Sequence, residues 1–495
     1  MNPIPSPHFL NAASSSSTTP LIPMVTKKVL SPHIVLFPFL AQGHINPFIS
    51  LASVLHRHYP NLTITLVSTP RTLESIRASF LPSSSIHFHA LPFSPESFNL
   101  PPHTEALTSL RFDQFISFYN ASLSLLPAFD SFIASIVDTS RPVTIVADFF
   151  FAWSVEVAHK YNAFHSILIS SGSFGTAVFF SICTHLPENI RKGDELFLPE
   201  YPEVVLHKTQ LPKYWFDDSV SKQWADFLQG QVRLCYKTDA MLANSVEEVE
   251  FIGLGMLRKT FKMPVWPVGP LLGAPDAMSE KDRGIMNWLD THKEGSVLFV
   301  SFGSQNTIQA KQMMELALGL EAAGRPFMWL IRPPVGYDVK GEFKPEWLPE
   351  GFEERMRQEG KGLLIYGWAP QVSILAHKST GAFLSHCGWN STLEALVHGV
   401  PIIGWPLSGE QFYNVMMLEK WRASVEMARG NYEYSHVDRE RVREVIETVM
   451  GESEKGKEIR KNAGVVKDLM DNAWKEGGSS VDGFHEFLKK AGVLV

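Results

Sequence analysis

His44 and Asp148 are the two residues whose types and positions suggest acid–base chemistry. His44 follows the apolar run from His33 to Phe39, and Asp148 ends the run from Val143. An imidazole with an ordinary pKa of about 6.5 is largely neutral near pH 7 and can accept a proton. A hydrogen-bonded carboxylate would orient the ring and stabilise the imidazolium. We therefore predict a general-base pair, against the alternatives of a loop histidine and a helix-capping aspartate.

A second polar cluster lies where an apolar run ends and a helical pattern begins. The run Thr380 to Ser385 passes through a turn at Cys387-Gly388 into the helical run 390–397. A helix N-terminus presents free N–H groups and a partial positive charge, which suit a diphosphate. His386, Asn390 and Ser391 add short polar groups there, and simple N-capping is the alternative explanation.

Two residues near this cluster have common structural explanations as well as functional ones. Ser391 and Glu394 have the S-x-x-E spacing of a capping box, so Glu394 serves either as a cap or as a ligand of a bound molecule. Trp368 follows Gly367 at the end of an apolar run, where a tryptophan is most often part of the core. From these residues alone both roles stay open.

The elements that must position these residues form two series of short apolar runs. Helical patterns lie between several of the runs, and this alternation predicts an α/β fold with two doubly wound, Rossmann-like parallel sheets. Carboxyl ends of parallel strands share one crevice, so His44 and Asp148 can meet although they are far apart in sequence. The expected strands are 33–39, 62–67, 86–91, 143–147 and 166–169 in the first series and 297–301, 327–331, 363–366, 381–385 and 401–405 in the second.

The segment from Trp368 to Gln411 resembles the 44-residue donor-binding signature of plant secondary-product UDP-glycosyltransferases in length and spacing. The flanking motifs Ser301-Phe-Gly-Ser304, Gln411-Phe-Tyr-Asn414 and Gly477-Gly-Ser-Ser480 are similar to that family too, and the resemblance covers about residues 31 to 495. It implies a GT-B fold, in which the two domains face a cleft. It also implies an inverting transfer of glucose from UDP-glucose to a hydroxyl of a small apolar acceptor, a flavonoid, another phenolic or a terpenoid, to give a β-glucoside.

The resemblance also implies roles for individual residues. Trp368 stacks on uracil, the Ala369 backbone and Gln371 hold the nucleoside, and Glu394 accepts hydrogen bonds from the ribose. The sugar is contacted by Trp389, Glu410 and Gln411, where Glu410 stands in place of the more usual aspartate and Gln411 favours glucose over galactose. His44 is the base, while Ser304, His386, Asn390 and Ser391 stabilise the departing UDP. Because hydrogen-bond donors and the helix dipole suffice to stabilise the departing UDP, no metal or cofactor is expected. UDP-glucose itself is a co-substrate.

The domain limits follow from composition and from the same resemblance. We expect a disordered leader (1–32), an acceptor-binding domain (33–263), a proline-rich linker (264–282), a UDP-sugar-binding domain (283–475) and a C-terminal segment (476–495) that returns to the first domain. The sequence indicates the acceptor pocket less clearly than the donor site. Its candidate residues, among many aromatic residues of the N-terminal half, are Phe93, Phe149 and Phe174.

Composition excludes several other classes. A net charge of −7 over 495 residues and the lack of basic runs argue against nucleic acid, and no apolar stretch predicts stable membrane insertion. Three cysteines without ligand spacing fit a reducing, cytoplasmic compartment, and we expect a monomer. A nicotinamide-dependent dehydrogenase would need a glycine fingerprint that is missing, and a glycoside hydrolase a carboxylate pair that no pattern identifies. A non-catalytic binder should lack the base or the donor segment, and both are present.

Overall fold

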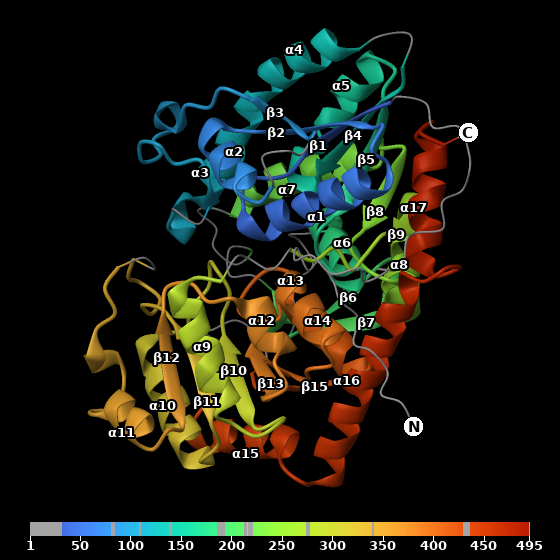
Figure 1. The fold of residues 1–495 in the computed structure, drawn as a ribbon. Helices are drawn as coiled ribbons and strands as arrows, with labels where there is room; N and C mark the ends of the chain where they lie inside the picture. Colours follow the sequence, from blue (N-terminus) through green and yellow to red (C-terminus); the bar gives the residue numbers. More distant parts are fainter. Residues whose placement is uncertain are drawn as a thin grey trace.

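The computed structural model describes residues 32–80, 85–107, 110–137, 141–185, 194–211, 215, 221–273, 278–338, 341–428 and 436–494. Apart from Pro32, the predicted leader 1–32 lies outside these residues. Two α/β domains are stacked one above the other, and the chain ends beside the first of them (Figure 1).

The N-terminal domain is built on a seven-stranded parallel sheet in the order β3-β2-β1-β4-β5-β8-β9. All five residues of β1 are buried, as expected for a strand that helices cover on both faces. The strands are β1 (His33–Phe37), β2 (Thr63–Ser68), β3 (His87–Ala90), β4 (Val143–Asp148), β5 (Phe164–Ile169), β8 (Ala240–Ala243) and β9 (Val265–Pro267). The helices are α1 (Gln42–His58), α2 (Pro70–Arg77), α3 (Phe115–Ser122), α4 (Leu126–Ile136), α5 (Ser154–Lys160), α6 (Ser173–His185), α7 (Ser221–Cys235) and α8 (Glu247–Phe261).

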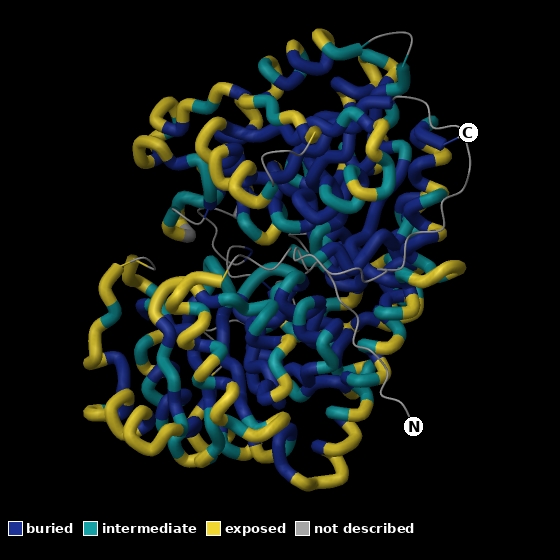
Figure 2. The backbone as a smooth tube through the Cα atoms, viewed as in Figure 1, coloured by how far each residue is buried: buried dark blue, intermediate teal, exposed yellow. Residues whose placement is uncertain are grey.

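The C-terminal domain repeats this plan with a six-stranded parallel sheet in the order β12-β11-β10-β13-β14-β15. In both domains the buried residues concentrate in the sheet and on the helix faces against it (Figure 2). The strands are β10 (Val297–Ser301), β11 (Phe327–Ile331), β12 (Gly362–Tyr366), β13 (Thr380–Ser385), β14 (Ile402–Gly404) and β15 (Ser424–Glu426). The helices are α9 (Glu280–Asp290), α10 (Ala310–Ala323), α11 (Phe352–Gln358), α12 (Gln371–Ala376), α13 (Trp389–Val397), α14 (Gln411–Lys420), α15 (Arg439–Met450) and α16 (Glu454–Ala473).

The last helix, α17 (Ser479–Lys490), packs on the N-terminal domain. Phe484, Phe487 and Leu488 are fully buried in one apolar cluster with Ile34 and Leu36 of β1. A Cβ on Gly483 would lie 2.1 Å from the carbonyl oxygen of Pro267, so helix and edge strand touch backbone to backbone. Residues far apart in sequence therefore form one core.

The start of the predicted linker 264–282 is wrong. Val265–Pro267 forms β9, which pairs with β8 at the edge of the N-terminal sheet, so this domain extends at least to Pro267. An edge strand tolerates proline because one side of it needs no N–H donor. Residues 274–277 of the linker lie outside the described part of the chain, and α9 begins at Glu280.

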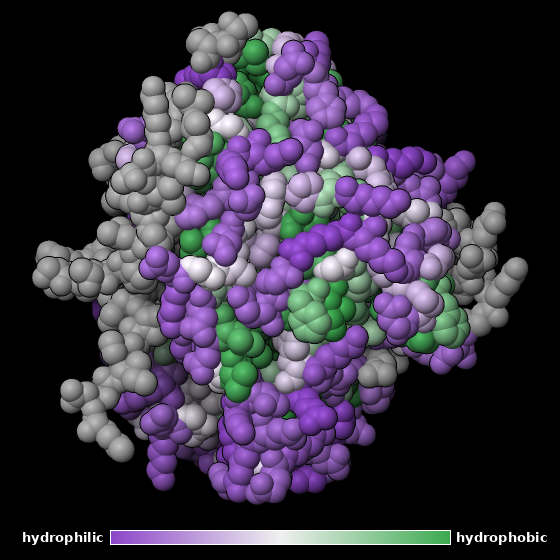
Figure 3. Space-filling model, turned by 90° about the vertical axis from the view of Figure 1, so that its right-hand side faces the viewer, coloured by the Kyte–Doolittle hydropathy of each residue, from purple (hydrophilic) through white to green (hydrophobic). Residues whose placement is uncertain are grey.

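The surface on the side of α17 is mostly hydrophilic, with hydrophobic patches separated by polar side chains (Figure 3). No helix in the described part of the chain is long and apolar enough to cross a membrane.

Candidate active site

His44 and Asp148 meet at the carboxyl end of the N-terminal sheet. Their strands are neighbours, with Phe37 of β1 opposite Ala147 of β4, so the chain segments that follow β1 and β4 start side by side. Nδ1 of His44 lies 2.8 Å from Oδ2 of Asp148. Asp148 is only 1% exposed, whereas the His44 side chain is 28% exposed. The carboxylate is thus buried behind a ring that reaches solvent.

Asp148 caps a short helix and binds the histidine at the same time. Its Oδ1 accepts a hydrogen bond from the backbone N–H of Phe150 at 3.0 Å, and Oδ2 faces His44. The hydroxyl of Ser170 lies 3.2 Å from the same Nδ1. When Nδ1 carries the proton that it shares with Asp148, Nε2 is the nitrogen free to accept one from a substrate. Asp148 is therefore both a helix cap and the hydrogen-bond partner of His44.

The charges around His44 act on its basicity. Burial lowers the pKa of His44, but the carboxylates of Asp148 and Glu410 raise it, and the net pKa lies above the usual 6.5. Because Glu410 belongs to the C-terminal domain, the other half of the molecule contributes to this shift.

Aromatic rings form a wall beside His44. Phe150 lies 5.3 Å and Phe39 5.7 Å from the imidazole, between ring centroids, and Tyr119 packs on both of them. The sequence offers both Phe149 and Phe150 as aromatic candidates for the acceptor pocket, and of these we single out Phe149, whereas the ring beside His44 is that of Phe150. Because Asp148 caps the turn that follows it, the second residue after Asp148 is the one whose ring reaches His44.

The three phenylalanines predicted to bind the acceptor take different positions. Phe93 is half-buried and contacts Phe118, and Phe149 is largely buried between Phe150 and Phe180. Phe174 is 0% exposed in the N-terminal core, so its ring does not reach a surface and the structure argues against an acceptor contact.

On the facing domain, α13 begins at Trp389 with Gly388 as its N-cap and without a side-chain cap. Asn390 and Ser391 are its second and third residues, so neither the simple N-cap nor the capping box suggested by the sequence is formed. The amides of the first turn are therefore not satisfied by a capping side chain, which leaves them for an anion.

His386 is clamped between two glycines next to this helix. A Cβ on Gly303 would lie 2.5 Å from the ring Cε1, and one on Gly388 would lie 2.5 Å from Nε2. Nδ1 is buried and has no hydrogen-bond partner among the described residues. Burial, followed by the charge of Arg332, lowers the pKa of His386 to about 4, so the ring is neutral at pH 7.

Arg332, directly after β11, is a site residue that the sequence does not single out. Its guanidinium donates a hydrogen bond to the carbonyl oxygen of Ser304 and acts on the pKa of His386. It thus places a fixed positive charge beside the residues predicted to hold UDP. A basic residue at a strand end of this sheet is the signal that could have identified it.

The predicted nucleoside residues form one patch. Gln371 Nε2 donates to Ser391 Oγ at 2.9 Å and to Glu394 Oε2 at 2.7 Å. Burial raises the pKa of Glu394 to about 7. Trp368 is 55% exposed, which contradicts a core role, while Ala369 beside it is buried. An exposed indole next to a carboxylate and an amide suits stacking and ribose recognition.

The predicted sugar residues lie closer to the N-terminal domain. The indole N–H of Trp389 donates to the carbonyl oxygen of Asn244 at 2.7 Å, so the side chain joins the domains and only its backbone remains for a ligand. Gln411 Oε1 accepts from the backbone N–H groups of Leu407 and Ser408, each at 3.0 Å. Burial raises the pKa of Glu410, against the opposing effect of His44.

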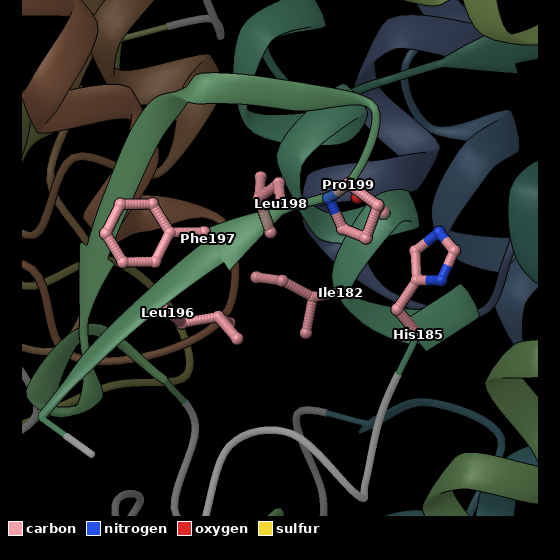
Figure 4. Close-up of a pocket in the computed structure, with 7 residues that line it drawn as sticks. Ile182, His185, Leu196, Phe197, Leu198 and Pro199 are labelled. Atoms are coloured by element: carbon pink, nitrogen blue, oxygen red, sulfur yellow. The ribbon is translucent and has the colours of Figure 1, made fainter. Parts of the chain in front are cut away.

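One further pocket lies elsewhere, between the end of α6 and the hairpin of β6 (Glu195–Leu198) and β7 (Tyr201–His207) (Figure 4). None of the predicted site residues lines it. Its lining consists of Ser181, Ile182, His185, Leu196, Phe197, Leu198 and Pro199. Within the described ranges, no group of three His, Cys, Asp or Glu side chains is placed to hold a metal ion.

Two doubly wound domains, with a His–Asp pair at a strand end of one and an uncapped helix of the other facing it, are the arrangement of a GT-B glycosyltransferase. The family model for UDP-glucoronosyl and UDP-glucosyl transferases matches residues 211–465, and that for the N-terminal domain of glycosyltransferases matches 31–273. The chain belongs to this family, as a plant family 1 UDP-glycosyltransferase, and it is an enzyme that uses a UDP-sugar donor.

Named relatives and solved structures agree with this assignment. UDP-glycosyltransferase 92A1 of Arabidopsis thaliana is 40% identical over 94% of this chain and 99% of its own length. Crocetin glucosyltransferase 3 of Crocus sativus is 41% identical over 86% of this chain and 93% of its own. The structure of Phytolacca americana UGT2 with UDP-2fluoro-glucose and pterostilbene superposes with a TM-score of 0.77 at 27% identity, over 93% of this chain and 100% of that one.

Proposed function

We propose that this enzyme transfers glucose from UDP-glucose to a hydroxyl of a small, largely apolar acceptor and yields a β-glucoside. The observation that carries the proposal is the His44–Asp148 pair at 2.8 Å, which lies beside aromatic rings and opposite the start of α13.

In this mechanism His44 Nε2 takes the proton of the acceptor hydroxyl as the oxygen attacks the anomeric carbon. Asp148 stabilises the imidazolium that forms, and a base so placed contributes roughly 10²–10⁴-fold. Attack from the face opposite the diphosphate breaks the bond to UDP in one displacement and inverts the anomeric centre. The first-turn amides of α13 and the partly buried charge of Arg332 support the negative charge that develops on UDP. The proposed step therefore needs no metal or cofactor.

The donor assignment rests on residues around the sugar position. Gln411 accepts the backbone N–H groups of Leu407 and Ser408 with its carbonyl oxygen, and its Nε2 amide donates to Ser408 Oγ at 3.4 Å, which leaves a second N–H for a sugar hydroxyl. Glu410 keeps the acidic group that the family places at this position. The names of the Crocus sativus relative and of a Fragaria ananassa relative, UDP-glucose flavonoid 3-O-glucosyltransferase 7, point to glucose as well.

The acceptor assignment rests on the wall of Phe39, Tyr119 and Phe150 beside His44. Rings at this position favour a flat or polycyclic apolar molecule, such as a flavonoid, another phenolic or a terpenoid. All three cysteines are free and buried, which supports action in the reducing cytoplasm, and we propose a monomer.

The proposal is tested by mass spectrometry of reactions with UDP-glucose, UDP-galactose or UDP-glucuronic acid and a panel of phenolic and terpenoid acceptors. We expect a product heavier by one hexose with UDP-glucose, in the β configuration by NMR, and its loss in His44→Ala. Retained UDP binding in that variant would show an intact donor site. UDP binding by the wild type without transfer to any acceptor would favour a non-catalytic binder.

A further inference from the structure

Glu250 is a buried carboxylate that the proposed mechanism does not use. It lies in α8, where its backbone leaves helical geometry at φ −112° and ψ 29°, and it is 1% exposed. Its Oε2 accepts the backbone N–H of Ser173 at 2.7 Å, and its Oε1 accepts that of Phe174 at 3.1 Å. These are the first two amides of α6, whose helix dipole also favours a negative charge.

Close packing of the two helices makes this contact specific. A Cβ on Gly253, one turn beyond Glu250, would lie 2.1 Å from the backbone nitrogen of Phe174. The backbones of α8 and α6 therefore touch. Because a buried carboxylate without its donors is costly, the start of α6 has little freedom to move away from Glu250.

The segment that Glu250 holds, residues 170–175, touches both halves of the active site. At one end, the hydroxyl of Ser170 lies 3.2 Å from Nδ1 of His44. At the other, a Cβ on Gly172 would lie 2.9 Å from the indole of Trp389, and one on Gly175 would lie 3.3 Å from Cβ of Glu410. A shift of this segment would thus move the base relative to the sugar position.

We infer that Glu250 is a positioning residue for glycosyl transfer, which fixes the start of α6 and through it the placement of His44 against the donor domain. The inference rests on the proposed role of His44 as the base. It assigns to Glu250 no contact with substrate.

The test is Glu250→Gln, which keeps the size of the side chain but turns one acceptor into a donor that opposes a backbone N–H. We expect kcat per UDP-binding site to fall by about tenfold or more, since small misplacements of reacting groups are costly. The stoichiometry and Kd of UDP binding, measured by calorimetry, should stay within about twofold of the wild type because the nucleotide patch lies in the other domain. Loss of folding alone would lower the stoichiometry and leave kcat per site unchanged, and that result would overturn the inference.

Two further variants sharpen the test. Ser173→Pro leaves Glu250 intact and removes one of the two backbone N–H groups that it accepts. Proline is tolerated there because Ser173 is the first residue of α6, and the variant should reproduce the loss of kcat. Glu247→Gln changes a carboxylate on the same helix that pairs with Arg258 near the surface, and should leave kcat unchanged.

A double-mutant cycle tests the route. Ser170→Ala combined with Glu250→Gln should cost less than the sum of the two single losses, because both act on one segment. Additive losses would show that Glu250 does not act through residues 170–175. Wild-type turnover and the His44→Ala variant are measured in the same series, so that a failure of the base assignment is seen separately.

Discussion

The side-chain amide of Asn390 donates a hydrogen bond to the carbonyl oxygen of Gly43 at 2.8 Å. This bond joins the first turn of α13 in one domain to the residue directly before His44 in the other. Asn390 Oδ1 is buried and has no hydrogen-bond partner among the described residues. The residue that we expect to contact the diphosphate is therefore also a link to the base.

Asn390→Ala should lower kcat/KM by about tenfold or more, because it removes both the link and a donor-site contact. Initial rates with UDP-glucose and the preferred acceptor measure this. Asn462→Ala is the matched control, since that amide donates to the Arg422 carbonyl at an exposed site. An Asn390→Ala enzyme as active as the control would contradict the role of this bond.

Asp148→Asn should reduce kcat by about 10²–10⁴-fold and shift the acid limb of the pH profile to lower pH. The base must be unprotonated, and the pKa of His44 is raised in part by Asp148, so wild-type activity falls as the pH drops through that raised pKa. Without the charge of Asp148 the pKa of His44 falls. The profile of kcat/KM for the acceptor shows the shift. Asp130→Asn, at the exposed pair with Lys160, should leave the profile unchanged, and an unshifted limb in Asp148→Asn would contradict the pairing.

Gly303→Ala should raise the KM for UDP-glucose by about tenfold or more, because the new Cβ would lie 2.5 Å from the His386 ring. Gly303 also has a φ of +79°, so part of the effect is backbone strain of about 1–2 kcal/mol. Gly295→Ala separates the two, since its φ is +64° and nothing lies within 4 Å of its Cβ position. Equal KM values for the two variants would speak against His386 as a donor-site residue. Donor kinetics and thermal melts measure the two effects.

Glu394→Gln should remove a pH dependence of donor binding centred near pH 7. The pKa of Glu394 is about 7, so its side chain is a deprotonated carboxylate, and can accept hydrogen bonds from the ribose hydroxyls with both oxygens, only above that pH. The affinity of the wild type for the donor should therefore increase from pH 6 to pH 8. Calorimetry with UDP-glucose tests this, because its diphosphate does not titrate in that range. An identical pH dependence in the variant would exclude Glu394 as the titrating group.

Stability gives a second readout of the same residue. A carboxyl whose pKa is raised from 4.5 to about 7 on folding destabilises the folded state once the pH exceeds the unfolded value, and the full cost is reached above pH 7. Glu394→Gln lacks this cost. The melting temperature of Glu394→Gln minus that of the wild type should therefore be higher at pH 8 than at pH 5.

Much of the fold was predictable because both faces of a parallel sheet are buried. Apolar runs at Val297–Ser301 and Phe327–Ile331 coincide with β10 and β11, β1 lies within its predicted run, and β4 covers the predicted strand 143–147 and Asp148. β8 is too short for its pattern to stand out, and β9 contains a proline that suggests a linker. Edge strands carry the weakest pattern because they are buried on fewer sides.

The placement of the candidate site residues was predictable where strand order decides it, and not where side-chain packing does. His44 and Asp148 follow adjacent strands, so their meeting is a property of the sheet. The contact of Phe150 with His44 and that of Arg332 with Ser304 depend on side-chain rotamers and packing inside each domain, although the strand-end position of Arg332 can be read from the sequence.

The chain passes between the domains twice, after β9 and again between α16 and α17. The hydrogen bonds from Trp389 to Asn244 and from Asn390 to Gly43 connect the same two domains, and both begin in the first turn of α13. Any change in the spacing of the domains would therefore have to break bonds at the helix that faces His44.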